Sequence, residues 1–484
     1  MTWKKSGVSQ SQFVLATGVR CAPSTCRKGG DRGEQTFEKI VNDKQGFKTT
    51  KLQEENILKK LLAVLFALGL VMAFAMPAAA ADISVSGTYY VGGVYEDNQD
   101  LLDNVGTADA FYFQRLRVQT ALAVNPALKL ITRFDAMEGY WTGGSPTEYQ
   151  NLGVRDDDNL DFDRVYLEAK MKYGVLSVGY MSDGAWGTWF ANGETENPRI
   201  KFTTMVKGWM LGAIYTKVTE SDHNTTYSDL DNDKYLVYVV KPFKGGVAGL
   251  LWVYLDYASN TDFLTTGEGF RTVYHILEPY VKAKIGNIYV EAELDYAIGS
   301  AQDWSAASGV QDVDKDSWSG YVNVKYFLSG GAYVGGQVAF VEGEDADPKT
   351  NTAGTTGADY DPCLILWNSD LYMWQGNAAM GTYNTTTDTM TNAWLYQAYA
   401  GYAVNPKLAL LASYTYAKVD EQGTNLDDDI GTEFDITATY KVMDNLEYMV
   451  GFGYFWAGDY FKAATATNKV DDDYIVMNKL TLSF

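Results

Sequence analysis

The sequence predicts an all-β fold, an antiparallel up-and-down β-barrel of about 18 strands. Two observations predict it. Runs of roughly ten residues alternate apolar with polar side chains along most of the chain, which is the period of a strand with two different faces. Short turns and long polar loops follow one another regularly between these runs. Sixteen strands stay open as an alternative, because each run is a weak signal by itself.

The first and last alternating runs indicate that the sheet closes on itself. Residues 82–95 alternate apolar with small polar side chains, and the chain ends in a second run of this kind. The apolar face of that last run consists of Tyr474, Val476, Leu480, Leu482 and Phe484. An unpaired apolar edge strand promotes aggregation, whereas pairing the last strand with the first leaves no edge. We therefore expect these two strands to be neighbours.

The other strands are expected in pairs, each joined by a short turn of Gly, Asn, Asp or Pro, the residues that tight turns favour. The expected ranges are 110–124, 128–140, 160–172, 175–181, 199–205, 209–217, 233–241, 247–258, 271–284, 288–298, 317–328, 332–342, 392–404, 407–419, 430–442 and 446–457. Two of these turns share the pattern Val-Asn-Pro, at Asn125 and Asn405. With an even number of strands, both chain ends of the barrel domain fall on the side of the short turns.

The region before the first strand has the pattern of a secretory signal peptide. Lys59 and Lys60 precede the apolar stretch 61–76, and small residues suited to cleavage after Ala81 follow it. A transmembrane anchor is the alternative, but a span needs about 20 apolar residues. We interpret 57–81 as the signal peptide, 1–56 as a non-structural leader that is an artefact of the gene model, and 82–484 as the barrel domain.

Composition disfavours several functions. A net charge of −22 argues against nucleic acid as a partner. Cys363 is the single cysteine after residue 81, so we expect neither a disulfide nor a cysteine-based metal site. His223 and His275 have no Ser or Asp at a catalytic spacing, so the chain is not expected to be an enzyme. Acidic clusters in the loops lack the Gly and Glu of a calcium loop, and we expect no metal or cofactor.

The charged faces of the strands must line the interior. In 110–124, Leu116 and Val118 share one face, while Arg115 and Arg117 share the other. In hydrocarbon every backbone group must pair internally, and a basic side chain facing lipid at mid-depth costs about 2–4 kcal/mol. A soluble sandwich, with its apolar residues inside, is the alternative. Aromatic residues near strand ends, including Phe113, Trp394 and Phe455, fit the girdles of a membrane barrel.

With these features, residues 82–484 resemble the Gram-negative outer-membrane porins. The resemblance rests on the signal peptide, the amphipathic strands, the rhythm of turns and loops, and the terminal Phe484. It implies a water-filled channel in the bacterial outer membrane for passive diffusion of small hydrophilic solutes and ions. It also implies contact with outer-membrane lipid and lipopolysaccharide, recognition of the C-terminal strand by the barrel-assembly machinery, and a homotrimer as one option. Eighteen strands resemble the specific porins for sugars or carboxylates more than the general porins.

In porins the third external loop commonly folds inward, and here that loop is 182–198. It carries three acids and an aromatic cluster: Asp183, Glu194, Glu196, Trp186, Trp189 and Phe190. The neighbouring strands direct basic side chains inward: Arg115, Arg117, Arg133, Arg164, Arg199 and Lys201. Acids facing a basic wall would produce a transverse field at the constriction. The alternative is that the arginines pair with Asp135, Asp163 or Glu168 and only hold the wall together.

The longest loop, 343–391, contains the apolar runs 363–367 and 372–374, which need cover. They could plug the mouth, fold over the barrel or contact a neighbouring subunit. A substrate-specific channel, a polysaccharide exporter and a non-conducting adhesin or structural barrel stay open as alternative functions. From the overall acidity we expect a mild preference for cations.

Overall fold

The computed structural model describes residues 82–484 apart from 100, 102, 104–107, 142–159, 222–229, 259–268, 305–308, 376–388, 423–426 and 463–468. The proposed leader and signal peptide, His223 and the acids at 156–158 lie outside the described residues. No described helix is long and apolar enough to cross a membrane.

The described part of the chain is almost entirely strand. Its elements are β1 (Asp82–Glu96), β2 (Asp109–Asn125), β3 (Leu128–Tyr140), β4 (Leu160–Met171), β5 (Gly174–Ser182), β6 (Glu196–Val206), β7 (Trp209–Thr219), β8 (Asn232–Phe243), β9 (Gly246–Tyr257), β10 (Phe270–Ile285), β11 (Ile288–Trp304), β12 (Val313–Phe327), η1 (Ser329–Gly331), β13 (Ala332–Val341), β14 (Thr350–Asn351), α3 (Ser369–Gln375), β15 (Ala393–Asn405), β16 (Leu408–Val419), β17 (Asp429–Met443), β18 (Leu446–Ala457), η3 (Asp459–Lys462) and β19 (Asp473–Ser483).

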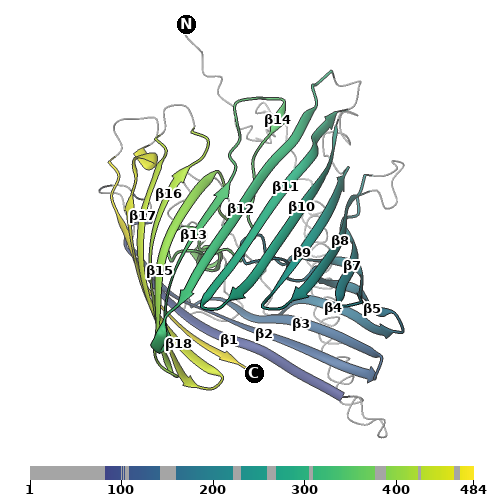
Figure 1. The fold of residues 1–484 in the computed structure, drawn as a ribbon, viewed down its shortest axis with the longest axis horizontal. Helices are drawn as coiled ribbons and strands as arrows, with labels where there is room; N and C mark the ends of the chain where they lie inside the picture. The colour runs from purple at the N-terminus through teal and green to yellow at the C-terminus, as the bar shows by residue number, and fades with distance from the viewer. Residues whose placement is uncertain are drawn as a thin grey trace, which may run out of the picture. The chain divides into compact units, whose positions relative to one another are not determined.

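The strands form one closed antiparallel barrel (Figure 1). Each strand pairs with the next along the chain, and β13 pairs with β15 because β14 makes only a two-residue parallel pairing with β12. Within the described residues the ring therefore holds eighteen strands, which confirms the larger of the two expected counts. The start of β1 and the end of β19 both lie on the side of the short turns, and the long loops gather at the opposite end of the barrel (Figure 1).

The expected closure between the first and last strands is confirmed. Tyr89 lies opposite Leu482 in the register of β1 and β19. The backbones of Gly87 and Phe484 exchange hydrogen bonds of 2.8 and 3.0 Å. A Cβ on Gly87 would lie 2.7 Å from the Phe484 ring, so only glycine lets the terminal aromatic ring rest against β1 at this point.

Short turns close the hairpins at one end of the barrel. The Asn125 side chain accepts a hydrogen bond from the Ala127 amide, and Asn405 accepts one from Lys407 in the matching turn. The two Val-Asn-Pro turns thus share one conformation-stabilising contact, in which an asparagine side-chain oxygen replaces a backbone acceptor. Lys207 and Gly208 both have positive φ, the conformation that suits a two-residue hairpin turn.

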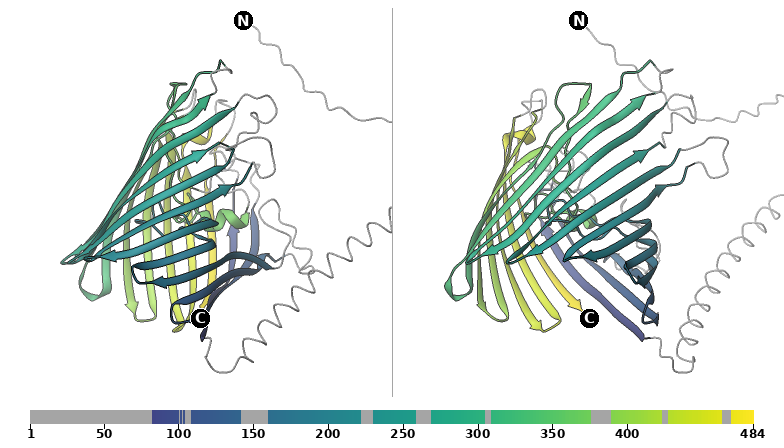
Figure 2. Two further views of the ribbon diagram at one scale, coloured as in Figure 1. Left: turned by 90° about the vertical axis from the view of Figure 1, so that its right-hand side faces the viewer. Right: turned by 45° about the vertical axis from the view of Figure 1, so that its right-hand side comes forward.

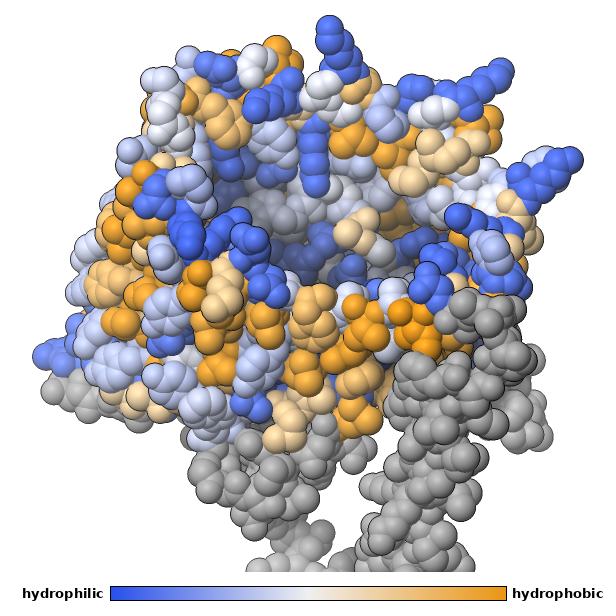
Figure 3. Space-filling model, turned by 90° about the horizontal axis from the view of Figure 1, so that it is seen from below, coloured by the Kyte–Doolittle hydropathy of each residue, from blue (hydrophilic) through white to orange (hydrophobic). Residues whose placement is uncertain are grey.

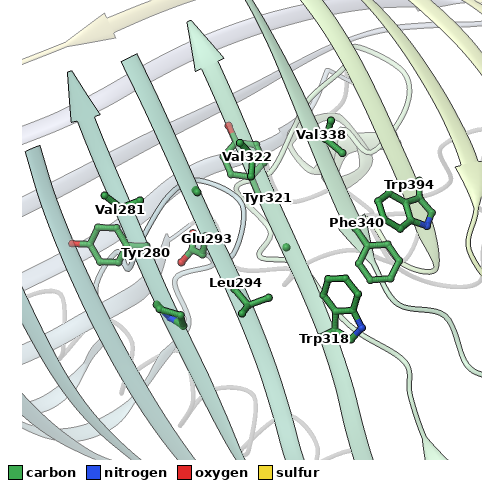
Figure 4. A pocket seen from close by; sticks show the side chains of 13 residues that line it. Tyr280, Val281, Glu293, Leu294, Trp318, Tyr321, Val322, Val338, Phe340 and Trp394 are labelled. Atoms are coloured by element: carbon green, nitrogen blue, oxygen red, sulfur yellow. The ribbon is translucent and has the colours of Figure 1, made fainter. Parts of the chain in front are cut away.

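The two faces of each strand differ in polarity as expected. On β11, Leu294 is 43% exposed on the outer surface whereas Glu293 is 4% exposed inside. Trp318, Phe340 and Trp394 lie side by side on the outside of β12, β13 and β15, with ring centroids 4.3 and 4.2 Å apart (Figure 4). The expectation for Phe113 and Phe455 is wrong: both are buried inside the barrel, because an apolar part of the longest loop packs against them.

Candidate channel and its constriction

The third loop, defined here as residues 183–195 between β5 and β6, folds into the barrel. Its acids meet the arginines of the neighbouring strands directly. Glu194 pairs with Arg164, and Asp183 with Arg199 at 3.1 Å. Burial alone would raise the pKa of Glu194, but the charge and hydrogen bond of Arg164 outweigh it and hold the pKa below its ordinary value.

Glu196, the first residue of β6, bridges two arginines. It pairs with Arg133 and, at 3.0 Å, with Arg164. Arg133 also reaches Asp163 on β4 at 2.8 Å. We call Arg133, Arg164, Arg199 and the acids Asp183, Glu194 and Glu196 the root cluster, because together they fix both ends of the third loop to β3, β4 and β6.

The remaining predicted basic residues pair within the wall. Arg117 makes two hydrogen bonds to the buried Asp135, at 2.7 and 2.6 Å. Arg115 pairs with Glu138 at 3.3 Å, and Lys201 donates to the backbone oxygen of Asp183 at 2.7 Å. Acids thus do face a basic wall, yet most of these charges are compensated by direct contact. Glu168, offered above as a partner of the arginines, lies instead beside Lys129.

The tip of the third loop crosses to β10, β11 and β12. Glu293 accepts hydrogen bonds from the amide and the hydroxyl of Thr188. Trp189 donates to the Tyr321 hydroxyl at 2.6 Å. The fully buried Phe190 stacks on the Tyr321 ring, with centroids 5.4 Å apart and planes inclined by 8°. Trp186 donates to the backbone oxygen of Glu278 on β10. The loop aromatics therefore anchor the loop to the inner wall.

Part of the longest loop also lies inside the barrel. We call residues 352–375 the inner segment. Its first half extends the third loop: the Gly357 amide donates to Phe190 and the Asp359 amide to Asn192, at 2.9 and 3.0 Å. Tyr360 is buried with its ring edge against Phe190. The two loops together thus form one layer across the lumen.

The second half of the inner segment reaches the opposite wall. Three consecutive backbone amides of 364–366 donate to Glu433 on β17. Helix α3 follows and lies within the ring of strands (Figure 2). Its Trp374 stacks on Phe113 of β2 at 4.9 Å, and Asp370 pairs with Lys479 of β19. The inner segment of this loop thus lies in the lumen, as a plug would, whereas β14 lies beside β12; residues 376–388 lie outside the described residues.

Space remains beside this layer, on the side of the short turns. Seen from that side, the barrel is hollowed, and hydrophilic side chains line much of the hollow (Figure 3). One cavity of about 660 Å³ lies between the third loop and β6–β10. A second, of about 420 Å³, lies between Trp189, Pro362 and strands β10–β16. The layer therefore narrows the barrel without filling it.

Lysines from alternate strands face these cavities. Lys201, Lys234 and Lys282 line the first, and Lys282 and Lys325 line the second. Among the described residues no acid forms an ion pair with Lys282 or Lys325. Lys234, Lys282 and Lys325 were not among the lumen residues expected from the sequence, although the inward alternation in 233–241, 271–284 and 317–328 could have identified them.

No protein-family model matches the chain, and no curated protein matches it. Solved structures of outer-membrane porins are similar in fold. A BenF-like porin from Pseudomonas fluorescens Pf-5 is 14% identical, with 83% of this chain and 99% of that chain covered and a TM-score of 0.47. The outer membrane protein opdK from Pseudomonas aeruginosa is 13% identical, with the same coverage and TM-score. The trimer form of OmpT from Vibrio cholerae is 14% identical, with 84% and 99% covered and a TM-score of 0.38.

Proposed function

We propose that this protein is an outer-membrane channel through which small hydrophilic solutes and ions diffuse passively. The observation that carries the proposal is the opposite polarity of the two barrel surfaces. Large apolar side chains, such as Val322 at 48% exposure, cover the outside, while carboxylates and amides lie inside. Lipid would cover the first surface and water would fill the spaces beside the second.

The constriction in this proposal is the layer formed by the third loop and the inner segment. A barrel of this strand number leaves a lumen wider than its own side chains can fill. Beside the layer, the described residues leave cavities along β6–β16. A channel so narrowed suits small solutes and leaves little room for a polysaccharide, which disfavours the exporter.

The lysines lining the remaining space support a preference for anions, in contrast to the cation preference expected from the overall charge. Four lysines and the acids Asp183, Glu278, Glu291 and Asp361 line the cavities; Asp183 is compensated by Arg199, whereas Lys282 and Lys325 face open space. The local field in a narrow passage depends on the groups that line it more than on net charge.

Planar-bilayer recording tests the proposal. Protein purified in detergent and added to one chamber should produce stepwise conductance increases, and a potassium chloride gradient should give a reversal potential of the sign for anions. Barrels that insert, as judged by protease protection in vesicles, yet remain electrically silent would support a non-conducting structural barrel instead. Conductance steps with a reversal potential of the sign for cations would support a channel but would contradict the proposal that the lysines make it prefer anions.

A further inference from the structure

Two buried carboxylates face the lumen from one strand without a basic partner. Glu433 and Asp435 lie on the inward face of β17 and are 0% and 5% exposed. Among the described residues, no ion pair with Lys or Arg compensates either one. Two adjacent buried carboxylates cannot both carry a charge unless a cation or a set of hydrogen-bond donors compensates them.

Backbone amides compensate only the first. Glu433 accepts hydrogen bonds from Leu364, Ile365 and Leu366 at 3.0, 2.7 and 2.8 Å. Because a carboxylate offers about four lone-pair directions, one direction is left on Glu433. Asp435 accepts a hydrogen bond from the Ser413 hydroxyl at 3.2 Å and shares another with the Glu433 carboxyl group, while its Oδ1 is buried with no partner. An orphaned carboxylate oxygen in such a place needs a proton or a cation.

A third donor approaches from the inner segment. The Sγ atom of Cys363 and one carboxylate oxygen each of Glu433 and Asp435 lie within 4.8 Å of one another. Cys363 is itself 5% exposed, and its Sγ is 3.3 Å from the Thr415 hydroxyl. One sulfur and two carboxylate oxygens suit zinc and similar divalent transition metals. Calcium and magnesium would require six or more oxygen ligands.

We propose that Cys363, Glu433 and Asp435 bind one divalent transition-metal ion of the zinc class, with water completing the coordination. On binding, the thiol and the carboxyl pair each release a proton to solvent, and the positive charge of the ion compensates the three anionic ligands. The ion would tie the inner segment to β17. This inference goes beyond the proposed function and does not depend on conduction. It also differs from the sequence expectation that a lone cysteine offers no metal site.

Cadmium titration tests the site, because a cadmium–thiolate bond absorbs in the ultraviolet where the protein's carboxylates do not. The full chain has three cysteines, so Cys21→Ser and Cys26→Ser are introduced first and Cys363 is the single thiol left. After chelator treatment in detergent, we expect one equivalent of Cd²⁺ to produce the thiolate band and zinc to compete with it. Elemental analysis after zinc dialysis should give one equivalent of zinc.

Variants separate this site from other binding. Cys363→Ser should abolish the band, and Asp435→Asn should weaken Cd²⁺ binding about 10–100-fold. Asp428→Asn, at an exposed acid just before β17, should change nothing. Any of three outcomes would overturn the proposal. One is the absence of a saturable band at one equivalent in the protein that retains Cys363. A second is an Asp435→Asn protein that binds Cd²⁺ as tightly as the parent does. A third is an Asp435→Asn protein that melts at a higher temperature than the parent, with metal changing the melting temperature of neither protein, which would indicate a proton shared by Glu433 and Asp435.

Discussion

Replacing Phe190 by alanine should release the tip of the third loop from the barrel wall. Phe190 is fully buried, stacked on Tyr321 and in edge contact with Tyr360. It therefore joins β12, the third loop and the inner segment at one point. Root-cluster ion pairs hold the ends of the loop, so the tip alone should move.

The magnitude follows from these contacts. Burying a phenylalanine contributes about 1.5–3 kcal/mol, and a stacked aromatic pair adds about 0.5–1.5 kcal/mol. The substitution should therefore weaken docking of the tip by about 3 kcal/mol. Since 1.4 kcal/mol corresponds to a factor of ten, the undocked population should rise roughly a hundredfold.

Single-channel recording measures that change. The Phe190→Ala protein should switch between the parent conductance level and a higher one, because the undocked tip no longer narrows the lumen. Phe461→Ala is the matched control: Phe461 is equally buried but lies in η3, where it packs on Phe455 and Tyr460. That variant should melt at a lower temperature and keep the parent conductance. A Phe190→Ala channel with the same levels and noise as the parent would refute the role of the tip.

Three further outcomes are expected. Lys282→Gln combined with Lys325→Gln should move the reversal potential in a potassium chloride gradient towards cations, whereas Lys172→Gln, at a short turn, should not. Arg117→Gln leaves Asp135 buried and unpaired, so it should lower the unfolding free energy by about 3–5 kcal/mol, and adding Asp135→Asn should restore much of the loss, measured as the temperature at which the band shifts in detergent gels. Burial raises the pKa of Asp361, in the inner segment, from 3.8 to about 7. Between pH 3.8 and about pH 7 the docked inner segment therefore binds more protons than the undocked one, so its docking weakens as the pH rises through this range. Conductance should be lower at pH 5 than at pH 8, and Asp361→Asn should reduce this difference.

The strands, their pairing and their orientation could be predicted because each depends on a local, repeated signal. Alternation fixes which side chains face lipid, and turn residues fix which strands are neighbours. Even the closure by β19 is encoded locally, in the alternation that ends at Phe484 and in the small residue Gly87 that accommodates its ring. Lengths were less predictable: β11 continues to Trp304, six residues beyond its expected end, because polar residues near the long loops no longer alternate with apolar ones.

The contacts inside the lumen could not be predicted, because they join segments far apart in sequence. The acids of the third loop were expected to face arginines, but the alternation of a strand does not reveal which acid each arginine contacts. Arg133 illustrates this: it bridges Asp163 on the next strand and Glu196 at the start of β6. Likewise, the apolar run 363–367 was expected to be buried against another part of the protein. Its own sequence did not indicate that its backbone amides would donate hydrogen bonds to Glu433.

The distribution of polarity inside the barrel explains where the inner segment packs. The inward side chains of β13 to β19 and of β1 and β2 include the apolar residues that pack on the inner segment, among them Phe113, Leu395 and Ile475. Those of β3 to β6 and of β11 and β12 are mainly charged or polar. Those of β7 to β9 form a second apolar cluster, Ile214, Leu236, Leu251, Val253 and Leu255, against which Trp186 of the third loop packs. Exposing the apolar side chains of β13 to β19 and of β1 and β2 to water would be unfavourable in free energy. The inner segment covers them and keeps water away from them. A polar wall needs no such cover. If the protein is a channel, as we propose, we expect the passage to run beside β10 to β13, where Lys282, Glu291, Asn323, Lys325 and Gln337 border the second cavity.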